Sequence, residues 1–409
     1  MTVRRRCIRS DIGGGDAMEC TGPRADLQKQ VCKISISDMD SSVLADRVAR
    51  RIKWHREHQN LTQQQVSDAM GFKDRQTFAA IEAGDRAVTP DELVSAATIL
   101  QCDIDDLFDP FRLTGEGDFN FRAEPDATAD AVDSFAQQAG RWIATYRELG
   151  RQAGQQAEPL SQKLDIRRDS SFEHVQASAE SLAKRWKLGD VPAMKLEEAV
   201  TRELGVLVLH VDAPKGISGA ASQLPGLRTI LINRREPRGR RFYNLAHELF
   251  HLLTWDALPP QRVEPLAVEA RKGNRVEQLA NNFAAALLMP EPVVSANWAR
   301  RGELDVTAWV LLTAKVLCVS PDALQWRIVN LRMITKGAMK RLKAMEEAGA
   351  AHLPELFSRP FVERVQEAVD AGRLSLRRAA SLLDLTVVAF ADLCRAYHLS
   401  LSYEFPAQA

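Results

Sequence analysis

The sequence lacks several features that would assign it to a class of protein. It has no run of about 18 apolar residues, and no apolar segment follows its basic first residues, so neither a membrane helix nor a secretory signal is expected. Its 6 cysteines show no C-x-x-C spacing, which fits a reducing compartment. Lys+Arg and Asp+Glu are equal at 54 each, so the general basic excess of a nucleic-acid-binding protein is missing. We therefore expect a cytoplasmic protein that has no membrane partner and that could bind DNA only through a local patch.

Residues 43–108 have the pattern of several short helices. Apolar residues recur there at helical spacing, and the pattern is interrupted near Asn60, Gly71, Gly84 and Pro90. Four or five helices are predicted. Basic residues are concentrated at 47–56, where a first helix could contact phosphate groups.

Thr62 is expected to cap one of these helices, because Gln65 follows three residues later as in a capping box. A helix, a turn at Gly71 and a second helix form the arrangement that places a helix in the major groove of DNA. The stretches LTQQQVSDAMG and DRQTFAAIEAGDRAVTPDEL resemble the Xre/Cro repressor-like helix-turn-helix family. The resemblance implies contacts with operator DNA at Gln63, Arg75, Gln76 and Thr77. The alternative is a helical domain that binds another protein.

The next part of the chain predicts helices and then strands. The stretch DAVDSFAQQAGRWIATYRELGRQAG is expected to form one long amphipathic helix that packs against its own chain, with a dimerisation seam and a homodimer as the alternative. Helices around 171–186 and 195–204 precede two short strands, GVLVLHVDAP and RTILINRREP. His210 in the first strand is expected to be packed and hydrogen-bonded, not a metal ligand.

The stretch NLAHELFHLLTW contains the pattern H-E-x-x-H inside an apolar helix. His247 and His251 are four residues apart, so both imidazoles lie on one helix face and can reach one metal ion. Glu248 is expected to act as the general base that takes a proton from metal-bound water. The alternative is a structural trio that is hydrogen-bonded within the core. Burying these three polar side chains would be costly unless each of them is satisfied.

A catalytic zinc site usually has three protein ligands, so a third ligand is expected downstream. The candidates are Glu264 in an expected loop, Glu269 in a charged stretch and Glu277 in the helical segment NRVEQLANNFAAALLMP. We predict Glu277, because small residues beside it would let a second helix approach the first closely. Asn281, one turn on, is expected to contact the ligands or the substrate.

The stretches RRFYNLAHELFHLLTW and ExxxNNFAAALLMP together resemble the ImmA/IrrE family of metallopeptidases. The resemblance implies a zinc-dependent, gluzincin-like endopeptidase (cofactor Zn²⁺) that cleaves DNA-binding repressors in response to stress or mobile-element signals. It implies metal ligands at His247, His251 and Glu277, with Glu248 as general base. Phe250 departs from the family, in which many members have glycine before the second histidine. Tyr243 and Arg241 are nearby candidates for the group that stabilises an oxyanion.

The last hundred residues predict further helices. LDVTAWVLLTAKVLCVSPDALQWRIVNLRMI reads as two helices that resemble the small module following the peptidase in this family. FVERVQEAVDAGRLSLRRAASLLDLTVVAFADLCRAYHL again has helix-turn-helix spacing, with Gly372, Ser375 and Thr386 at helix boundaries. Arginines cluster there at 373–378, so DNA contact and a protein-interaction surface are both open.

Together these features predict a mainly α protein with a small α+β unit: an N-terminal helix-turn-helix domain, a central zincin-like metallopeptidase domain and C-terminal helical modules. The expected divisions are a disordered basic tail (1–40), the helix-turn-helix domain (43–110), a helical linker (111–165), the metallopeptidase (166–295), a helical module (296–348) and a helix-turn-helix-like module (349–409). The predicted function is a DNA-binding regulator that cleaves a protein partner, such as a repressor or an antitoxin. The alternative is a metal- or ligand-sensing transcription factor, or an antitoxin, that does not cleave.

Overall fold

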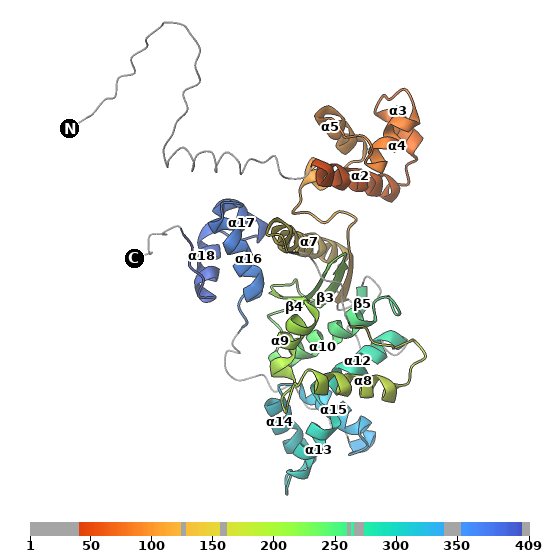
Figure 1. Cartoon of the computed structure of the whole chain (residues 1–409). Coiled ribbons are helices and arrows are strands. Elements are labelled where there is room, and N and C mark those ends of the chain that lie inside the picture. The colour runs from red at the N-terminus through yellow and green to blue at the C-terminus, as the bar shows by residue number, and fades with distance from the viewer. Residues whose placement is uncertain are drawn as a thin grey trace, which may run out of the picture. The chain divides into compact units, whose positions relative to one another are not determined.

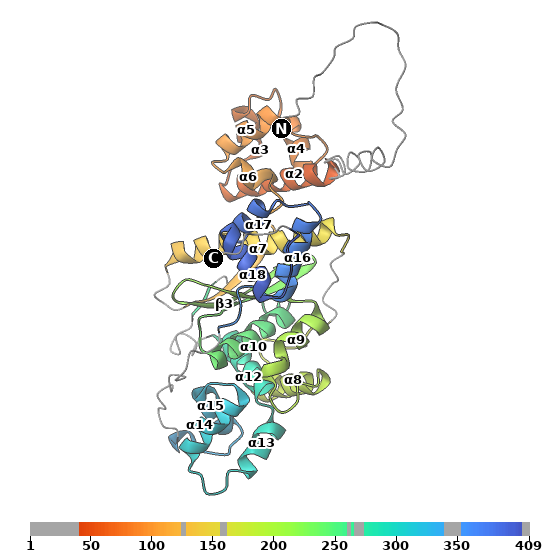
Figure 2. The same cartoon turned by 90° about the vertical axis from the view of Figure 1, so that its left-hand side faces the viewer.

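The computed structural model describes residues 41–123, 128–155, 162–259, 263–265, 274–338 and 353–402. The chain divides into two compact units, Met1–Phe108 and Asp109–Ala409, and each is described by itself (Figures 1 and 2). The fold is mainly helical with one small mixed sheet, as the sequence predicts. The expected basic tail at 1–40 and the candidate ligand Glu269 lie outside the described residues.

The first unit is a bundle of short helices. They are α2 (Ser41–His58), α3 (Gln63–Ala69), α4 (Arg75–Ala83), α5 (Pro90–Ile99) and α6 (Ile104–Phe108). The capping box predicted for Thr62 and Gln65 is present at the start of α3. Gly84 ends α4 in the left-handed conformation, which glycine adopts without steric cost. Local capping signals therefore define the start of α3 and the end of α4, as expected.

A five-stranded sheet organises the second unit. Its strands are β1 (Asp118–Ala123), β2 (Leu207–Val211), β3 (Ile217–Leu224), β4 (Leu227–Asn233) and β5 (Val263–Pro265), in the order β2-β4-β3-β1-β5. β3 pairs antiparallel with β1 and β4, whereas β2–β4 and β1–β5 are parallel pairs. Alternate residues of β2 and β4 enter two different hydrophobic cores, as the two-residue period of a strand requires.

The helices that carry the predicted metal ligands cover one face of this sheet. The core on that face combines alternate sheet residues with α8 (Phe172–Arg185), α9 (Ala193–Leu204), α10 (Arg238–Thr254), α12 (Arg275–Leu288), α13 (Glu291–Ala299), α14 (Val306–Leu317) and α15 (Pro321–Asn330). A short 3-10 helix, η2 (Lys336–Ala338), follows α15. Within the described residues no single helix has the length and apolarity to cross a membrane, although α14 and α15, bent by 109°, would together meet those criteria.

Arg327 in α15 fastens this helical layer together. Its side chain is 1% exposed and donates hydrogen bonds to the Met289 carbonyl at the end of α12 (2.9 Å) and to Gln176 in α8 (2.8 Å), and it also pairs with Glu180. A buried guanidinium must be fully hydrogen-bonded to be tolerated, and these contacts use both of its edges. α15 is therefore anchored to α8 and α12.

The opposite face of the sheet is covered by elements from distant parts of the sequence. The long predicted helix, α7 (Ala129–Gln152), shares a core with α16 (Arg359–Asp370), α17 (Leu376–Leu382) and α18 (Val387–Ala396) (Figure 2). Trp142 of α7 meets Phe357 edge-to-face at 5.1 Å. The expectation that this helix packs against its own chain is confirmed. The stretch expected to be a linker also supplies β1, and the division of the chain into six segments stays a prediction.

Two of the three clustered C-terminal arginines that could contact DNA are engaged within the unit, whereas Arg377 is exposed. Arg378 pairs with Asp109 at 2.8 Å, and Arg373 donates to the Leu149 carbonyl at 3.5 Å. In α18, Arg395 pairs with Asp392. These contacts favour a role for the C-terminal helices in packing over a role in binding DNA.

Asp212, just after β2, makes stability depend on acid pH. Although burial opposes ionisation, hydrogen bonds from Arg234 (2.9 Å) and Arg235 (2.8 Å) lower the pKa of Asp212 to about 2. A carboxyl group whose pKa is lower in the folded than in the unfolded chain stabilises the fold when it is ionised. This stabilisation is complete above the unfolded pKa of about 4 and is lost as the pH falls to about 2. We expect urea unfolding of Asp212→Asn to depend less steeply on pH across this window than that of the wild type. Asp169→Asn, at an exposed position, is the control; equal slopes for Asp212→Asn and wild type would contradict the assignment.

Candidate metal centre and DNA-binding surface

The H-E-x-x-H segment lies in α10, whose apolar side chains pack between the sheet and α12. His247, Glu248 and His251 are all fully buried within this helix. Asn274 caps the start of α12, and its side chain accepts a hydrogen bond from the Val276 amide (3.1 Å). Alanines at 280 and 284 are fully buried, so α12 presents small side chains where the helices approach, as the sequence predicts. This close approach brings Glu277 to the histidines.

Three potential ligand side chains converge between α10 and α12. His247 Nε2 lies 3.3 Å from Glu277 Oε2, His251 Nε2 lies 3.2 Å from Glu277 Oε1, and the two Nε2 atoms are 3.1 Å apart. All three side chains are 0% exposed. Of the described residues, these three form the group of histidine and acidic side chains whose ligand atoms lie within 4.8 Å of one another.

The spacing of these atoms fits a small metal ion. Zinc–nitrogen bonds of about 2.0–2.1 Å in a tetrahedral site place neighbouring ligand atoms about 3.3–3.4 Å apart. The observed separations of 3.1–3.3 Å are close to this value. Two imidazole nitrogens and one carboxylate also form a donor set that suits several divalent ions, including zinc. The residues present therefore fit a metal ion, with Glu277 as the carboxylate ligand.

Glu248 lies beside this cluster against β3. A methyl group added at Gly219 would lie 3.9 Å from Glu248 Cγ and only 2.9 Å from the Leu231 carbonyl oxygen. Glycine is therefore required at this position of β3, because a side chain would clash with the backbone of β4. The sequence reasoning missed both β3 and Gly219, although the glycine within an apolar stretch was a usable signal for a close approach.

Tyr243 and Asn281 form a contact one helical turn away from the ligands. The Tyr243 hydroxyl donates to the backbone oxygen and to Oδ1 of Asn281, both at 3.1 Å. Each residue is half-buried, so this contact is nearer to solvent than the ligands are. Arg241, the other oxyanion candidate, donates to the carbonyls of Arg234 (3.1 Å) and Glu236 (2.7 Å), which fixes the loop before α10. Both oxyanion candidates are therefore engaged in hydrogen bonds, and Tyr243 is the one that contacts α12, the helix of Glu277.

The other predictions around the site have different outcomes. Phe250 is fully buried and packs edge-on against His251 with ring centroids 5.7 Å apart. His210 in β2 is hydrogen-bonded through Nε2 to Glu197 at 2.9 Å, which confirms the packed role expected for it. Glu264 was expected in a loop, and that expectation is wrong: it lies in β5, which pairs with β1 in parallel. Pro265 does not prevent this pairing, because proline is tolerated on an edge strand.

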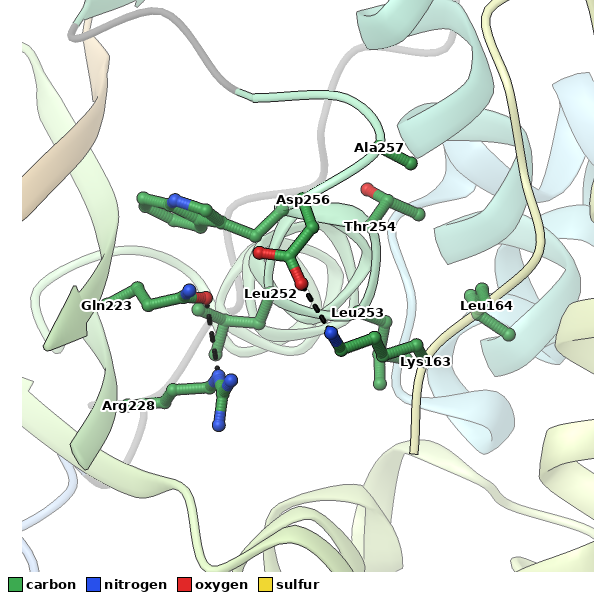
Figure 3. Close-up of a pocket in the computed structure, with 10 residues that line it drawn as sticks. Lys163, Leu164, Gln223, Arg228, Leu252, Leu253, Thr254, Asp256 and Ala257 are labelled. Atoms are coloured by element: carbon green, nitrogen blue, oxygen red, sulfur yellow. Dashed lines mark hydrogen bonds and ion pairs between the residues drawn. The ribbon is translucent and has the colours of Figure 1, made fainter. Parts of the chain in front are cut away.

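A separate small pocket lies at the C-terminal end of α10 and has a volume of about 50 Å³ (Figure 3). Lys163 and Asp256 form an ion pair there, and Arg228 donates to Gln223 at 3.3 Å. Among the described residues that line it, none belongs to the His–His–Glu cluster. This pocket is therefore distinct from the metal centre.

The predicted DNA-contact residues gather at the start of α4 and α3. Arg75 and Gln76 are exposed at the N-terminus of α4. Gln63 accepts a hydrogen bond from Arg75 (3.3 Å) and donates to Glu82 (2.8 Å). Thr77 is half-buried and bound to the N-cap side chain of α4. Of the four predicted contact residues, Arg75 and Gln76 are therefore exposed, while Gln63 and Thr77 are partly engaged within the domain.

Two family models match parts of the chain. The model described as helix-turn-helix matches residues 52–107, and the model described as IrrE N-terminal-like domain, of the peptidase M78 type, matches residues 201–328. A comparison with curated proteins gives no match. The second match includes α10 and α12 with the whole His–His–Glu cluster. The chain thus combines an XRE-type helix-turn-helix domain, which indicates DNA binding, with an IrrE/ImmA-like metallopeptidase domain, the architecture that its sequence predicts.

Proposed function

We propose that the protein is a DNA-binding regulator whose metallopeptidase domain cleaves a protein partner, such as a repressor or an antitoxin. The observation that carries the proposal is the convergence of His247, His251 and Glu277 on one point, with Glu248 next to the first ligand in the same helix. The match to the IrrE N-terminal-like domain and the helix-turn-helix match in the same chain support it.

The roles of the side chains follow from their chemistry. His247, His251 and Glu277 would hold the ion, for which we propose Zn²⁺. Such an ion, when bound, lowers the pKa of a water molecule from about 15.7 to about 7 and polarises a carbonyl group. Glu248 accepts the proton of the attacking water on its carboxylate and passes it to the nitrogen of the departing amine. Asn281 and Tyr243 fix α12 to α10 beside the ligands.

The burial of the site favours a second candidate function. Glu248 and the three ligand residues are all 0% exposed, so a peptide bond can reach them only after neighbouring elements move. A domain that senses a metal ion without cleaving a partner would have to admit only the ion and not a peptide segment. In that case regulation would depend on the ligands but not on Glu248.

The substrate can be identified by comparing newly formed protein N-termini in cells that carry the wild type or Glu248→Gln under stress. We expect at least one cleaved protein, a repressor or an antitoxin, to appear with the wild type alone. Regulation that survives in Glu248→Gln but is lost in His247→Ala would support the sensing function instead. Cleavage products that are identical in both strains would contradict the proposed peptidase mechanism.

DNA binding is expected to depend on Arg75 and Gln76. Each side chain that reads a base edge contributes about 1–3 kcal/mol of discrimination, so Arg75→Ala with Gln76→Ala should weaken operator binding by more than about tenfold. A gel-shift titration at several salt concentrations measures this effect. Gln138→Ala with Arg141→Ala, the same residue types on α7, is the matched control. Equal losses in both double variants would contradict the assignment.

A further inference from the structure

Helix α14 presents an apolar face to solvent at the end of the second unit that α13–α15 form (Figures 1 and 2). Leu312 and Val316 are 56% and 59% exposed, and Ala308, one turn before them, is partly exposed. Side chains four residues apart lie on the same face of a helix, so these three form a ridge on the outer side of α14. We call Ala308, Leu312 and Val316 the α14 ridge.

The other side of α14 belongs to the core of the unit. Its buried residues are Trp309, Val310, Thr313, Ala314 and Leu317. Lys315 is the one charged residue among the 12 residues of the helix. A helix that is apolar on all sides is normally buried, and contiguous apolar surface on a folded protein marks an interaction site. The α14 ridge therefore has the composition of a surface that another surface covers.

The charges at the two ends of α14 are of opposite sign. Glu303 and Asp305 precede the helix, whereas Lys315 lies in its last turn, and all three residues are exposed. A second copy of α14 laid antiparallel to the first would place the basic end of each helix beside the acidic start of the other. α14 is therefore complementary in charge to a reversed copy of itself, but not to a parallel copy.

The ridge residues fit the same antiparallel arrangement. A two-fold axis level with position 310, midway between 308 and 312, would set Ala308 of each copy against Leu312 of the other. A small residue would then face a large one twice, which lets the two helices approach closely. The same axis brings Lys315 level with Asp305 of the other copy, so this pairing also occurs twice. Apolar packing and charge thus select one register.

We propose that the α14 ridge is the contact surface of a homodimer in which two copies of α14 pack antiparallel about a two-fold axis. Closed two-fold dimers are the commonest oligomers of soluble proteins. The 12 residues of α14 span only about 18 Å, so the contact buries less than the about 800 Å² per partner of a standard interface. We therefore expect a dissociation constant in the micromolar range.

A membrane surface fits the α14 ridge less well than a second copy does. Helices that lie on membranes combine an apolar face with a polar face rich in Lys and Arg. The face of α14 opposite the ridge is instead packed in the core, and Glu303 and Asp305 at its start would be repelled by anionic lipids.

Association is tested by sedimentation velocity of the full-length protein across the micromolar range. We expect a monomer–dimer equilibrium for the wild type. Leu312→Asp should raise the dissociation constant by more than about 100-fold, because each dimer would bury two unpaired carboxylates. Lys315→Glu should raise it several-fold, since it places like charges level with each other. Val388→Asp, at a 45% exposed position of α18, is the matched control and should associate like the wild type.

The antiparallel register is tested by disulfide cross-linking between copies. Ala308→Cys and Leu312→Cys are prepared as separate variants and oxidised alone and as an equal mixture, and the bonded peptides are identified by mass spectrometry. We expect the mixture to form the bond between positions 308 and 312 faster than either variant forms a bond with its own copy. The reason is that a disulfide needs Cα atoms about 4.4–6.8 Å apart, and only unlike positions are level with each other in this register.

A wild type that stays monomeric throughout the micromolar range, or a dimer that persists in Leu312→Asp, would overturn the proposal. So would a monomer that binds anionic vesicles through Leu312, which would assign the ridge to a membrane surface. Equal cross-linking in the mixture and in the single variants would overturn the antiparallel register. Far-UV circular dichroism and metal content like those of the wild type establish that each variant is folded. None of these measurements depends on cleavage of a partner, so this inference and the proposed peptidase function can fail separately.

Discussion

Glu248→Gln is expected to lower the rate of partner cleavage by about 10²–10⁴-fold while metal content stays near one ion per chain. The reason is that general-base catalysis contributes about this factor, whereas Glu248 does not belong to the cluster of ligand atoms. Glutamine keeps the size of the side chain but lacks its negative charge and its ability to accept a proton. The variant therefore separates proton transfer from metal binding.

The measurement requires purified protein, zinc and the substrate identified from cells, with cleavage followed by mass spectrometry and metal by elemental analysis. Glu173→Gln, an exposed position at the start of α8, is the matched control and should cleave at the wild-type rate. Loss of metal in Glu248→Gln would mean that this carboxylate helps to hold the ion. Undiminished cleavage with normal metal content would exclude Glu248 as the base.

Local chemistry made the helices and the metal motif predictable. The capping box at Thr62, the left-handed glycine after α4 and the spacing of His247 and His251 all act within one or two helical turns. Glu277 was within reach of the same reasoning because small residues beside a buried carboxylate indicate a close helix contact. Each of these signals depends on neighbours that are also close in sequence.

Long-range pairing was not predictable from the same signals. β1 is separated from its partner β3 by almost a hundred residues, and β1 lies in a stretch that was read as a linker. The burial of Phe121 depends on α7 and the C-terminal helices, which meet only after folding. The short strand β5 likewise has no pattern of its own and exists because β1 offers it an edge. Sheet edges are set by tertiary contacts, so a single sequence gives little sign of them.

Glu277→Gln is expected to raise the dissociation constant for zinc by more than about 100-fold. Replacing even a residue that only supports a metal ligand typically costs 10–100-fold in affinity, and Glu277 supplies a ligand atom itself. At saturating zinc, a 100-fold weaker affinity corresponds to about 2.7 kcal/mol less metal-dependent stabilisation. Competition with a chelator of known affinity measures the first quantity, and urea unfolding with and without zinc measures the second.

The metal-free protein should respond much less to the same substitution. Without an ion, Glu277 lies 3.2–3.3 Å from the Nε2 atoms of His247 and His251, and glutamine keeps the side-chain size and can still form hydrogen bonds with them. Glu277→Gln should therefore be close to the wild type in stability in excess chelator and clearly less stable in excess zinc. Glu198→Gln, whose side chain is 76% exposed on α9, should follow the wild type under both conditions. Equal destabilisation of Glu277→Gln with and without zinc would identify Glu277 as a structural group, and the third ligand would then have to come from elsewhere in the chain.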